Sequence, residues 1–147
     1  MMGGEPPVVP PNFPVLACVV QAAHQNDIPL ALLLAIGKQE GGRVGMRKPN
    51  TDGSTDNGPM QINNRAWGAR LSTYGITMDM VADDPCVNVH TAAFILRTEI
   101  NSAGGNVWFG VGHYHSRTPW RANQYMQLVW KRYQPIVEEL ERLGYRD

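Results

Sequence analysis

Apolar positions recur at helical spacing along most of the chain. The first predicted helix covers about residues 15–26, where Leu16, Val19, Val20 and Ala23 share one face. A second helix is predicted over about 30–40, because Pro29 suits its first turn and two glycines follow Glu40. Its interior is almost entirely apolar, so we expect it to be central and buried.

Polar segments separate these helices from the rest of the pattern. Residues 43–59 are rich in Gly, Asn, Asp and Ser and predict a loop, and a loop this long is more often functional than idle. Asp84 and Pro85 have the residue types of a helix cap and first turn. No strand pattern exceeds four residues, so the predicted fold is mainly α with at most a very short β element. The further helices are expected over about 64–72, 85–102, 106–113 and 119–143.

Composition narrows the class of protein. The chain has 147 residues, of which 43% are hydrophobic, as a single globular domain requires. Thirteen basic residues balance thirteen acidic ones, so no electrostatic footprint for nucleic acid is expected. No apolar run reaches about 18 residues, which argues against a membrane span. The first four residues do not resemble a signal peptide.

The N-terminal segment differs in character from the remainder. Residues 5–14 contain five prolines, which lack a backbone donor and favour an extended arm. We therefore divide the chain into a proline-rich arm, 1–14, and a domain, 15–147. The arm could contact a partner, but a spacer role explains its composition equally well.

The two cysteines, Cys18 and Cys86, allow two interpretations. A bridge between them would close a loop of about 70 residues, which the chain-entropy model values at roughly 4 kcal/mol. Two buried free thiols would fit the composition equally well. A bridge would indicate an oxidising compartment.

Glu40 is the first candidate for chemistry. It lies four residues after Ile36 and seven after Leu33, on the face of the buried stripe. Burial and the negative end of the helix dipole both predict a raised pKa for this carboxyl. A carboxylic acid that keeps its proton near neutral pH can protonate a glycosidic oxygen. Gly41 and Gly42 beside it would leave room for a sugar ring, although a solvated glutamate at a helix end is the plain alternative.

The segment 50–63 supplies short polar side chains that can bond sugar hydroxyl and acetamido groups. It does not fit a calcium loop, because the sixth position from Asp52 is Asn57 and the twelfth is Asn63. The histidines do not form a zinc spacing either, since His113 and His115 are alternate residues on a predicted helix. We expect no metal and no cofactor.

Three blocks in order carry a family resemblance. The run LLAIGKQEGG ending at Gly42, the segment NTDGSTDNGPMQIN over 50–63 and the block GVGHYHS over 110–116 resemble the lytic transglycosylase (SLT) domain. That domain has a fold like that of goose-type lysozyme. The resemblance covers roughly residues 15–135 and is strongest to members associated with type IV secretion and conjugation.

This resemblance implies a role for several residues. Glu40 matches the catalytic glutamate, Met60 and Gln61 the pair that lines the sugar cleft, and Tyr114 the tyrosine whose hydroxyl approaches and orients the glutamate. Ser54, Asn63 and His115 are further expected substrate contacts, His115 standing where Asn is more usual. The stretch around Cys86 resembles one that carries half of a disulfide, which favours the Cys18–Cys86 bridge.

The implied activity is cleavage of the β-1,4 bond between N-acetylmuramic acid and N-acetylglucosamine in peptidoglycan. The expected product is a 1,6-anhydro end, formed without water. Such an enzyme would act in the periplasm as a monomer and open the cell wall for secretion or conjugation proteins. Two alternatives stay open: a lysozyme-type hydrolase that uses Asp52 or Asp56 as a second carboxylate, and an inactive peptidoglycan-binding module. Both aspartates could equally be turn-formers.

The tryptophans receive different interpretations. Trp130 lies at helical spacing from Met126 and Tyr133, which predicts a core position. Trp67 follows the polar segment, and a place in the cleft is one possibility for it.

Overall fold

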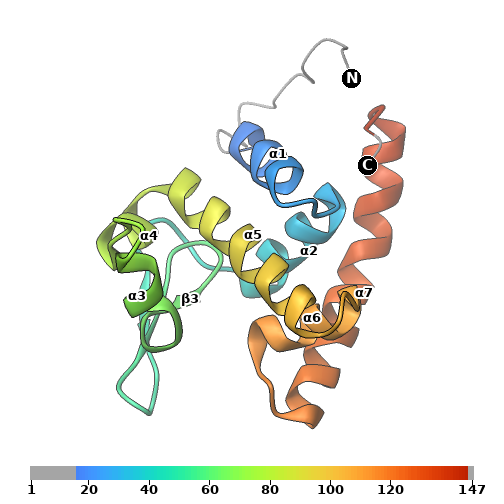
Figure 1. Ribbon diagram of the computed structural model, residues 1–147. Coiled ribbons are helices and arrows are strands. Elements are labelled where there is room, and N and C mark those ends of the chain that lie inside the picture. Colours follow the sequence, from blue (N-terminus) through green and yellow to red (C-terminus); the bar gives the residue numbers. More distant parts are fainter. Residues whose placement is uncertain (1–15, 146–147) are drawn as a thin grey trace.

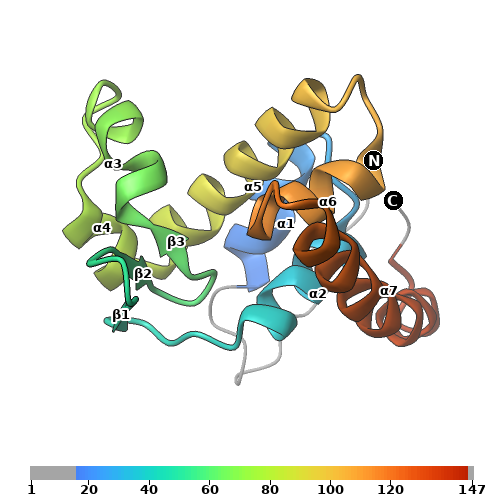
Figure 2. The same ribbon diagram turned by 90° about the horizontal axis from the view of Figure 1, so that it is seen from below.

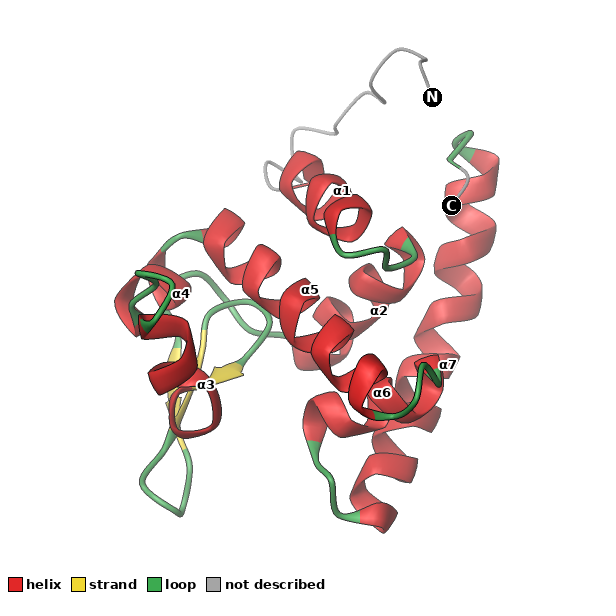
Figure 3. Ribbon diagram, viewed as in Figure 1, coloured by secondary structure: helices red, strands yellow, loops and turns green. Residues whose placement is uncertain are grey.

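The computed structural model describes residues 16–145 as a mainly helical protein (Figure 1). The proline-rich arm predicted for 1–14 lies outside the described residues. Helices dominate the molecule and the strands are short (Figure 3). The elements of the described part are α1 (Leu16–Gln25), α2 (Leu30–Glu40), β1 (Arg47–Pro49), β2 (Thr55–Asn57), β3 (Ile62–Asn63), α3 (Asn64–Ser72), α4 (Met78–Asp83), α5 (Pro85–Ser102), α6 (Val107–His115) and α7 (Pro119–Arg142).

The second helix, α2, forms part of the core, as its sequence predicts. Six of its side chains are buried, and Leu32, Leu33 and Ile36 are at most 1% exposed. The helix packs against α1 and α7. Burial of α2 on several sides fixes the position of its last residue, Glu40.

The polar segment is more ordered than a plain loop. Strands β1, β2 and β3 form an antiparallel sheet in that order, with Lys48 paired to Asp56 and Asp56 paired to Asn63. This small sheet agrees with the prediction of at most a very short β element, and the mainly α fold class is confirmed. Because these strands have two or three residues each, their periodicity is too short to identify in the sequence.

The long helix α5 separates two sides of the molecule. In Figures 1 and 2, α3, α4 and the strands lie on one side of α5, and α6 and α7 lie on the other. Helix α5 contacts α1, α4 and α6, while α7 packs on α2 and α6. This arrangement places the end of α2 and the middle of α5 between the two sides.

Two features differ from the sequence prediction. Helix α4 has only six residues and was not predicted. Trp130 was expected in the core but is 46% exposed, and its ring packs against Trp108 and Tyr133 on the surface. The helical spacing correctly groups Trp130 with Tyr133, but the apolar stripe of α7 that faces the core passes through Tyr125 and Val129 instead.

Cys18 and Cys86 form a disulfide that joins the beginning of α1 to the beginning of α5. This selects the bridge over two free thiols. Among residues 16–145, no helix combines the length and apolar character needed to cross a membrane.

Candidate active site

Two cavities stand out in the described part of the chain, and their linings differ. One, of about 520 Å³, is mostly apolar and lies beside the beginning of α5, with Tyr74, Ile76 and Phe94 in its wall. The other, of about 790 Å³, is mostly polar and contains Glu40. Its wall combines strand and α3 residues with residues of α5, α6 and α7, so it lies between the two sides of the molecule. We call this second cavity the cleft.

Glu40 is the last residue of α2 and is partly buried at the cleft wall. The pKa of its carboxyl is raised to about 7, chiefly by burial and to a smaller extent by the negative charge of Asp56. A hydrogen bond from Tyr125 and the charge of Lys48 oppose the rise in pKa. The raised pKa that the sequence predicts is thus present, with burial as its main cause.

The two glycines after Glu40 differ in their surroundings, and only Gly41 has open space beside it. Gly41 ends α2 in the left-handed conformation, with φ of 64° and open space at its Cβ position. At Gly42, a Cβ would lie only 2.2 Å from the carbonyl oxygen of Gly58. Gly42 therefore allows the chain to pack closely against the turn before β3, and it does not leave room for a sugar.

The tyrosine that bonds Glu40 is Tyr125, not Tyr114. Tyr125 Oη donates to Glu40 Oε2 at 2.5 Å, whereas Tyr114 Oη donates to the backbone carbonyl of Met60 at 2.9 Å. The expectation that the Tyr114 hydroxyl orients the glutamate is corrected by this geometry. The sequence gives one signal for Tyr125, which lies on the buried stripe of α7 between Ala122 and Val129.

Three aromatic rings, those of Tyr114, His115 and Tyr125, stack beside Glu40. The Tyr114 and Tyr125 rings are stacked at 6.5 Å, and His115 stacks on Tyr125 at 4.7 Å. His115 and Tyr114 both line the cleft, as predicted for substrate contacts. Burial lowers the pKa of His115, which favours the neutral imidazole at neutral pH.

We call the part of the cleft wall formed by β1, β2, β3 and α3 its strand side. The polar residues predicted there as substrate contacts, Ser54 and Asn63, are largely hydrogen-bonded to neighbouring residues of the same wall. Ser54 is 1% exposed and its hydroxyl donates to Asp52 at 2.5 Å. Asn63 donates to Ser54 and Asp56 and caps α3 by accepting from two backbone amides. Both residues line the cleft, but these bonds show that they shape its wall.

Met60 and Gln61 are adjacent but differ in position. Met60 is 3% exposed and its sulfur packs against Gly37, so its side chain belongs to the core and not to the cleft lining. Gln61 does line the cleft, with φ of 54° and its amide donating to the carbonyl of Gly58. Of this predicted pair, only Gln61 is placed to reach a ligand with its side chain.

Asn88 is a buried residue that the sequence does not reveal. Its amide donates to the carbonyls of Asn57 and Val81, and its oxygen accepts from the amide of Met60. It is 0% exposed. These three bonds attach the strand side of the cleft to α5.

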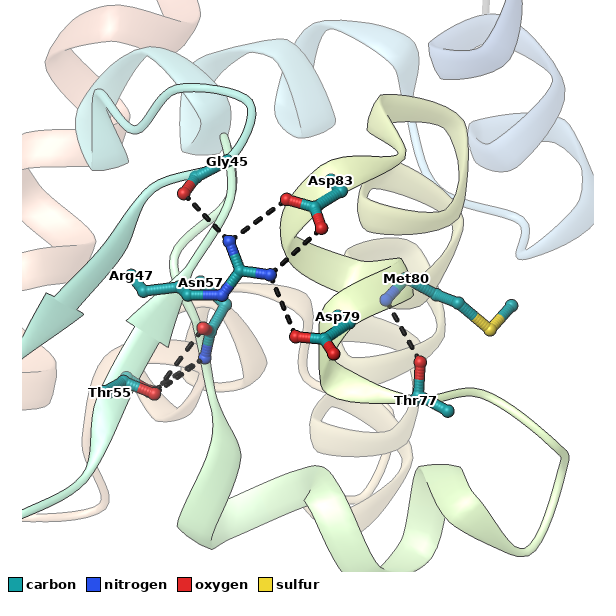
Figure 4. Close-up of polar contacts among 8 residues, drawn as sticks. All are labelled: Gly45, Arg47, Thr55, Asn57, Thr77, Asp79, Met80 and Asp83. Carbon is teal, nitrogen blue, oxygen red and sulfur yellow. Dashed lines mark hydrogen bonds and ion pairs between the residues drawn. The ribbon is translucent and has the colours of Figure 1, made fainter.

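A second set of bonds joins the strand side of the cleft to α4. Arg47 on β1 donates to Asp79 and Asp83 of α4 at 2.9–3.0 Å and to the carbonyl of Gly45 (Figure 4). The two carboxylates raise the pKa of Arg47 and keep it charged. The pairs are exposed and contribute less than a buried bond.

Asp52 and Asp56 both line the cleft but have different partners. Asp52 accepts from the amide and hydroxyl of Ser54, and these bonds lower the pKa of its carboxyl. That is the turn-forming arrangement. Asp56 accepts from Asn63, and its charge acts on Glu40. Of the two, Asp56 is the candidate for a second carboxylate.

The cleft lining also includes Glu99 and Arg117, which the sequence does not single out. Glu99 of α5 is 6% exposed and accepts from Arg117 at 2.6 Å. Trp67 lines the cleft, so the cleft position considered for it is found. Within residues 16–145 no three His, Cys, Asp or Glu side chains gather as a metal site would require.

Comparison with known proteins gives consistent matches. The family model described as the transglycosylase SLT domain matches residues 17–129. The chain is 36% identical to invasion protein IagB of Salmonella typhi over 126 residues, which cover 82% of this chain and 78% of that protein. It is 33% identical to protein IpgF of Shigella flexneri over 134 residues, covering 88% of this chain and 87% of that protein.

Proposed function

The chain belongs to the transglycosylase SLT domain family, and from this premise we propose that it is a peptidoglycan lytic transglycosylase with Glu40 as its catalytic residue. The observation that carries the proposal is a carboxyl group with a pKa of about 7 at the wall of a polar cleft. Such a group is protonated in a large fraction of molecules at neutral pH, as a general acid must be. Peptidoglycan is the substrate class that the family implies.

In the proposed mechanism, Glu40 first donates its proton to the glycosidic oxygen that leaves C1 of N-acetylmuramic acid. The resulting carboxylate then takes the proton of the C6 hydroxyl of the same sugar, whose oxygen attacks C1. The C1–O bond to the leaving sugar breaks, a new C1–O6 bond forms, and Glu40 regains its proton. One carboxyl therefore serves as both acid and base, and no water is consumed.

Tyr125 and the aromatic wall support this role. The bond from Tyr125 leaves the second oxygen of Glu40 without a protein partner among the bonds of the described residues. That oxygen is available for the proton transfer. His115 and Gln61 line the cleft beside it and are the proposed substrate contacts, together with the ring of Tyr114. Met60, Ser54 and Asn63 support the wall in this proposal.

A second candidate function is hydrolysis of the same bond, as in a lysozyme. Asp56 favours it, because its carboxylate lines the same cleft and its charge reaches Glu40. In a hydrolase, Asp56 would position water or stabilise the charge that develops at C1. The family match favours the transglycosylase.

The cellular role follows from the relatives only by analogy. One relative is called an invasion protein. We propose that this chain acts in the periplasm and opens peptidoglycan locally for an envelope-spanning secretion or conjugation machine, as a monomer bridged by the Cys18–Cys86 disulfide.

The test is digestion of purified peptidoglycan followed by mass spectrometry of the released fragments. We expect anhydro products, lighter by one water than hydrolysis products, from the wild type and none from Glu40→Gln. Asp56→Asn should retain anhydro product formation. Reducing-end products that disappear in Asp56→Asn would establish the hydrolase instead. Retained glycan binding without any product would make the chain a binding module.

A further inference from the structure

Two of the cations that line the cleft form no ion pair with the described part of the chain. Lys48 of β1 and Arg121 of α7 are both exposed and both line the cavity that holds Glu40. Among residues 16–145 neither forms an ion pair with Asp or Glu, although other arginines do. Their positive charges therefore face the space where a ligand would lie.

Other charged side chains that line the cleft already have a charged or aromatic partner. Arg117 is paired with the buried Glu99, and Asp52 lies 3.5 Å from Arg65. The guanidinium of Arg70 lies over the rings of Trp67 and Phe94. Arg121 has one ring contact, with its exposed neighbour Trp120, which leaves its N–H donors available.

The two cations belong to elements on opposite sides of the cleft. Lys48 belongs to the strand side and Arg121 to the first turn of α7 on the other side (Figures 1 and 2). The charge of Lys48 acts on Glu40, and that of Arg121 acts on His115. His115 stacks on Tyr125, which bonds Glu40, so the electrostatic influence of both cations reaches the group of residues around Glu40.

We propose that Lys48 and Arg121 form a carboxylate-binding subsite that recognises the acidic substituent of N-acetylmuramic acid. The inference rests on the proposed function, since it concerns the sugar cleaved in that cleft. Muramic acid differs from glucosamine by a lactyl ether at C3, whose carboxyl group is either free or linked to a stem peptide that carries its own carboxylates. Arg is suited to such groups because its guanidinium forms paired hydrogen bonds to a carboxylate.

Binding is measured separately from cleavage, so that the two proposals can fail independently. Glu40→Gln prevents turnover while retaining the size and shape of the side chain. Calorimetric titration would compare its binding of three soluble tetrasaccharides of alternating N-acetylglucosamine and N-acetylmuramic acid: one with free lactyl carboxylates, one with these converted to methylamides, and one with stem peptides. The same titrations are made with Arg121→Gln, Arg121→Lys or Lys131→Gln added, Lys131 being an exposed cation of α7 outside the cleft.

We expect at least one carboxylate-bearing form to bind roughly tenfold more tightly than the methylamide, which is the usual scale of one charge-assisted hydrogen bond. Arg121→Gln should remove this preference, Arg121→Lys should keep part of it and Lys131→Gln should keep all of it. High salt should weaken the preference. Preference for the free lactyl form identifies that carboxylate as the ligand, and preference for the peptide form alone identifies the stem.

Equal binding of all three forms, or no sugar binding, would overturn the subsite and leave the cations as solvated surface charges. A preference that survives Arg121→Gln would also overturn the assignment to Arg121. If the wild type releases no product from peptidoglycan but the charge preference is present, the catalytic proposal fails and the subsite stands.

Discussion

At the scale of single residues, the chemistry depends on how Glu40 is surrounded. Its pKa is the result of burial and Asp56 acting against Tyr125 and Lys48. A general acid loses activity when it loses its proton, so kcat/KM should fall as the pH rises above about 7. This fall is the descending limb of the pH profile of kcat/KM. Removing a neighbour that lowers the pKa of Glu40 should shift the limb to higher pH, and removing one that raises the pKa should shift it to lower pH.

Tyr125→Phe should shift the descending limb to higher pH. The hydroxyl of Tyr125 stabilises the ionised carboxylate, so its removal raises the pKa of Glu40. The maximal rate should fall by roughly tenfold or more, because the carboxyl loses the bond that orients it. The pH dependence of kcat/KM gives the measurement.

Tyr114→Phe is the matched control, since the hydroxyl of Tyr114 bonds the carbonyl of Met60 and not Glu40. The limb should remain at its wild-type position in this variant. A shift in Tyr114→Phe with none in Tyr125→Phe would show that the assignment of the orienting tyrosine is wrong.

Glu40→Gln should stabilise the fold at high pH but not at low pH. The folded-state pKa of about 7 exceeds the ordinary value of 4.5, so ionisation costs more in the folded chain than in the unfolded one. Below pH 4.5 both states are protonated and the cost is absent. It develops as the pH rises from 4.5 to 7 and reaches about 3 kcal/mol above pH 7. Urea unfolding at pH 4 and pH 8 measures it, and an equal difference between the two proteins at both pH values would contradict the raised pKa.

At the scale of elements, the strand side of the cleft is held by two sets of bonds of different kinds. Asn88 makes three buried hydrogen bonds, whereas Arg47 makes exposed ion pairs with α4. A buried group left without its partner costs the full desolvation energy, while an exposed pair contributes little. The two attachments should therefore differ in their effect on stability.

Asn88→Ala should lower the free energy of unfolding by about 2–4 kcal/mol, because it leaves the Met60 amide and two carbonyls unpaired. Arg47→Gln should cost much less than this, because its ion pairs are exposed and screened by solvent. Urea unfolding compares the two variants, and hydrogen exchange of residues 57–61 should increase in Asn88→Ala alone. Similar losses in both variants would mean that α5 does not anchor this wall through Asn88.

At the scale of the whole molecule, the disulfide ties the first described helix, α1, to the long helix α5. Cys18 and Cys86 are 68 residues apart, so the bridge restricts much of the unfolded chain. The cleft residues lie outside this covalent contact, since neither cysteine lines the cavity of Glu40. Stability and activity should therefore respond differently to its loss.

Replacing both cysteines by alanine should lower the free energy of unfolding by about 4 kcal/mol on the chain-entropy model. Activity of the folded protein at room temperature should change little. Urea unfolding with and without a thiol reductant measures the first effect, and only the wild type should respond to the reductant. If the cysteine variant is folded but has lost activity, the bridge also shapes the cleft.

The sequence by itself determined the features that depend on near neighbours. Helix limits followed from periodicity and caps, as at α5, where Asp84 accepts from the amides of Cys86 and Val87. The place of Glu40 on a buried helix followed in the same way. The site partners came only from the tertiary structure: Tyr125 is 85 residues from Glu40, and Asn88 is 28 from Met60. Nothing local marks such pairs, because their contact depends on how α5 and α7 pack against the rest of the core.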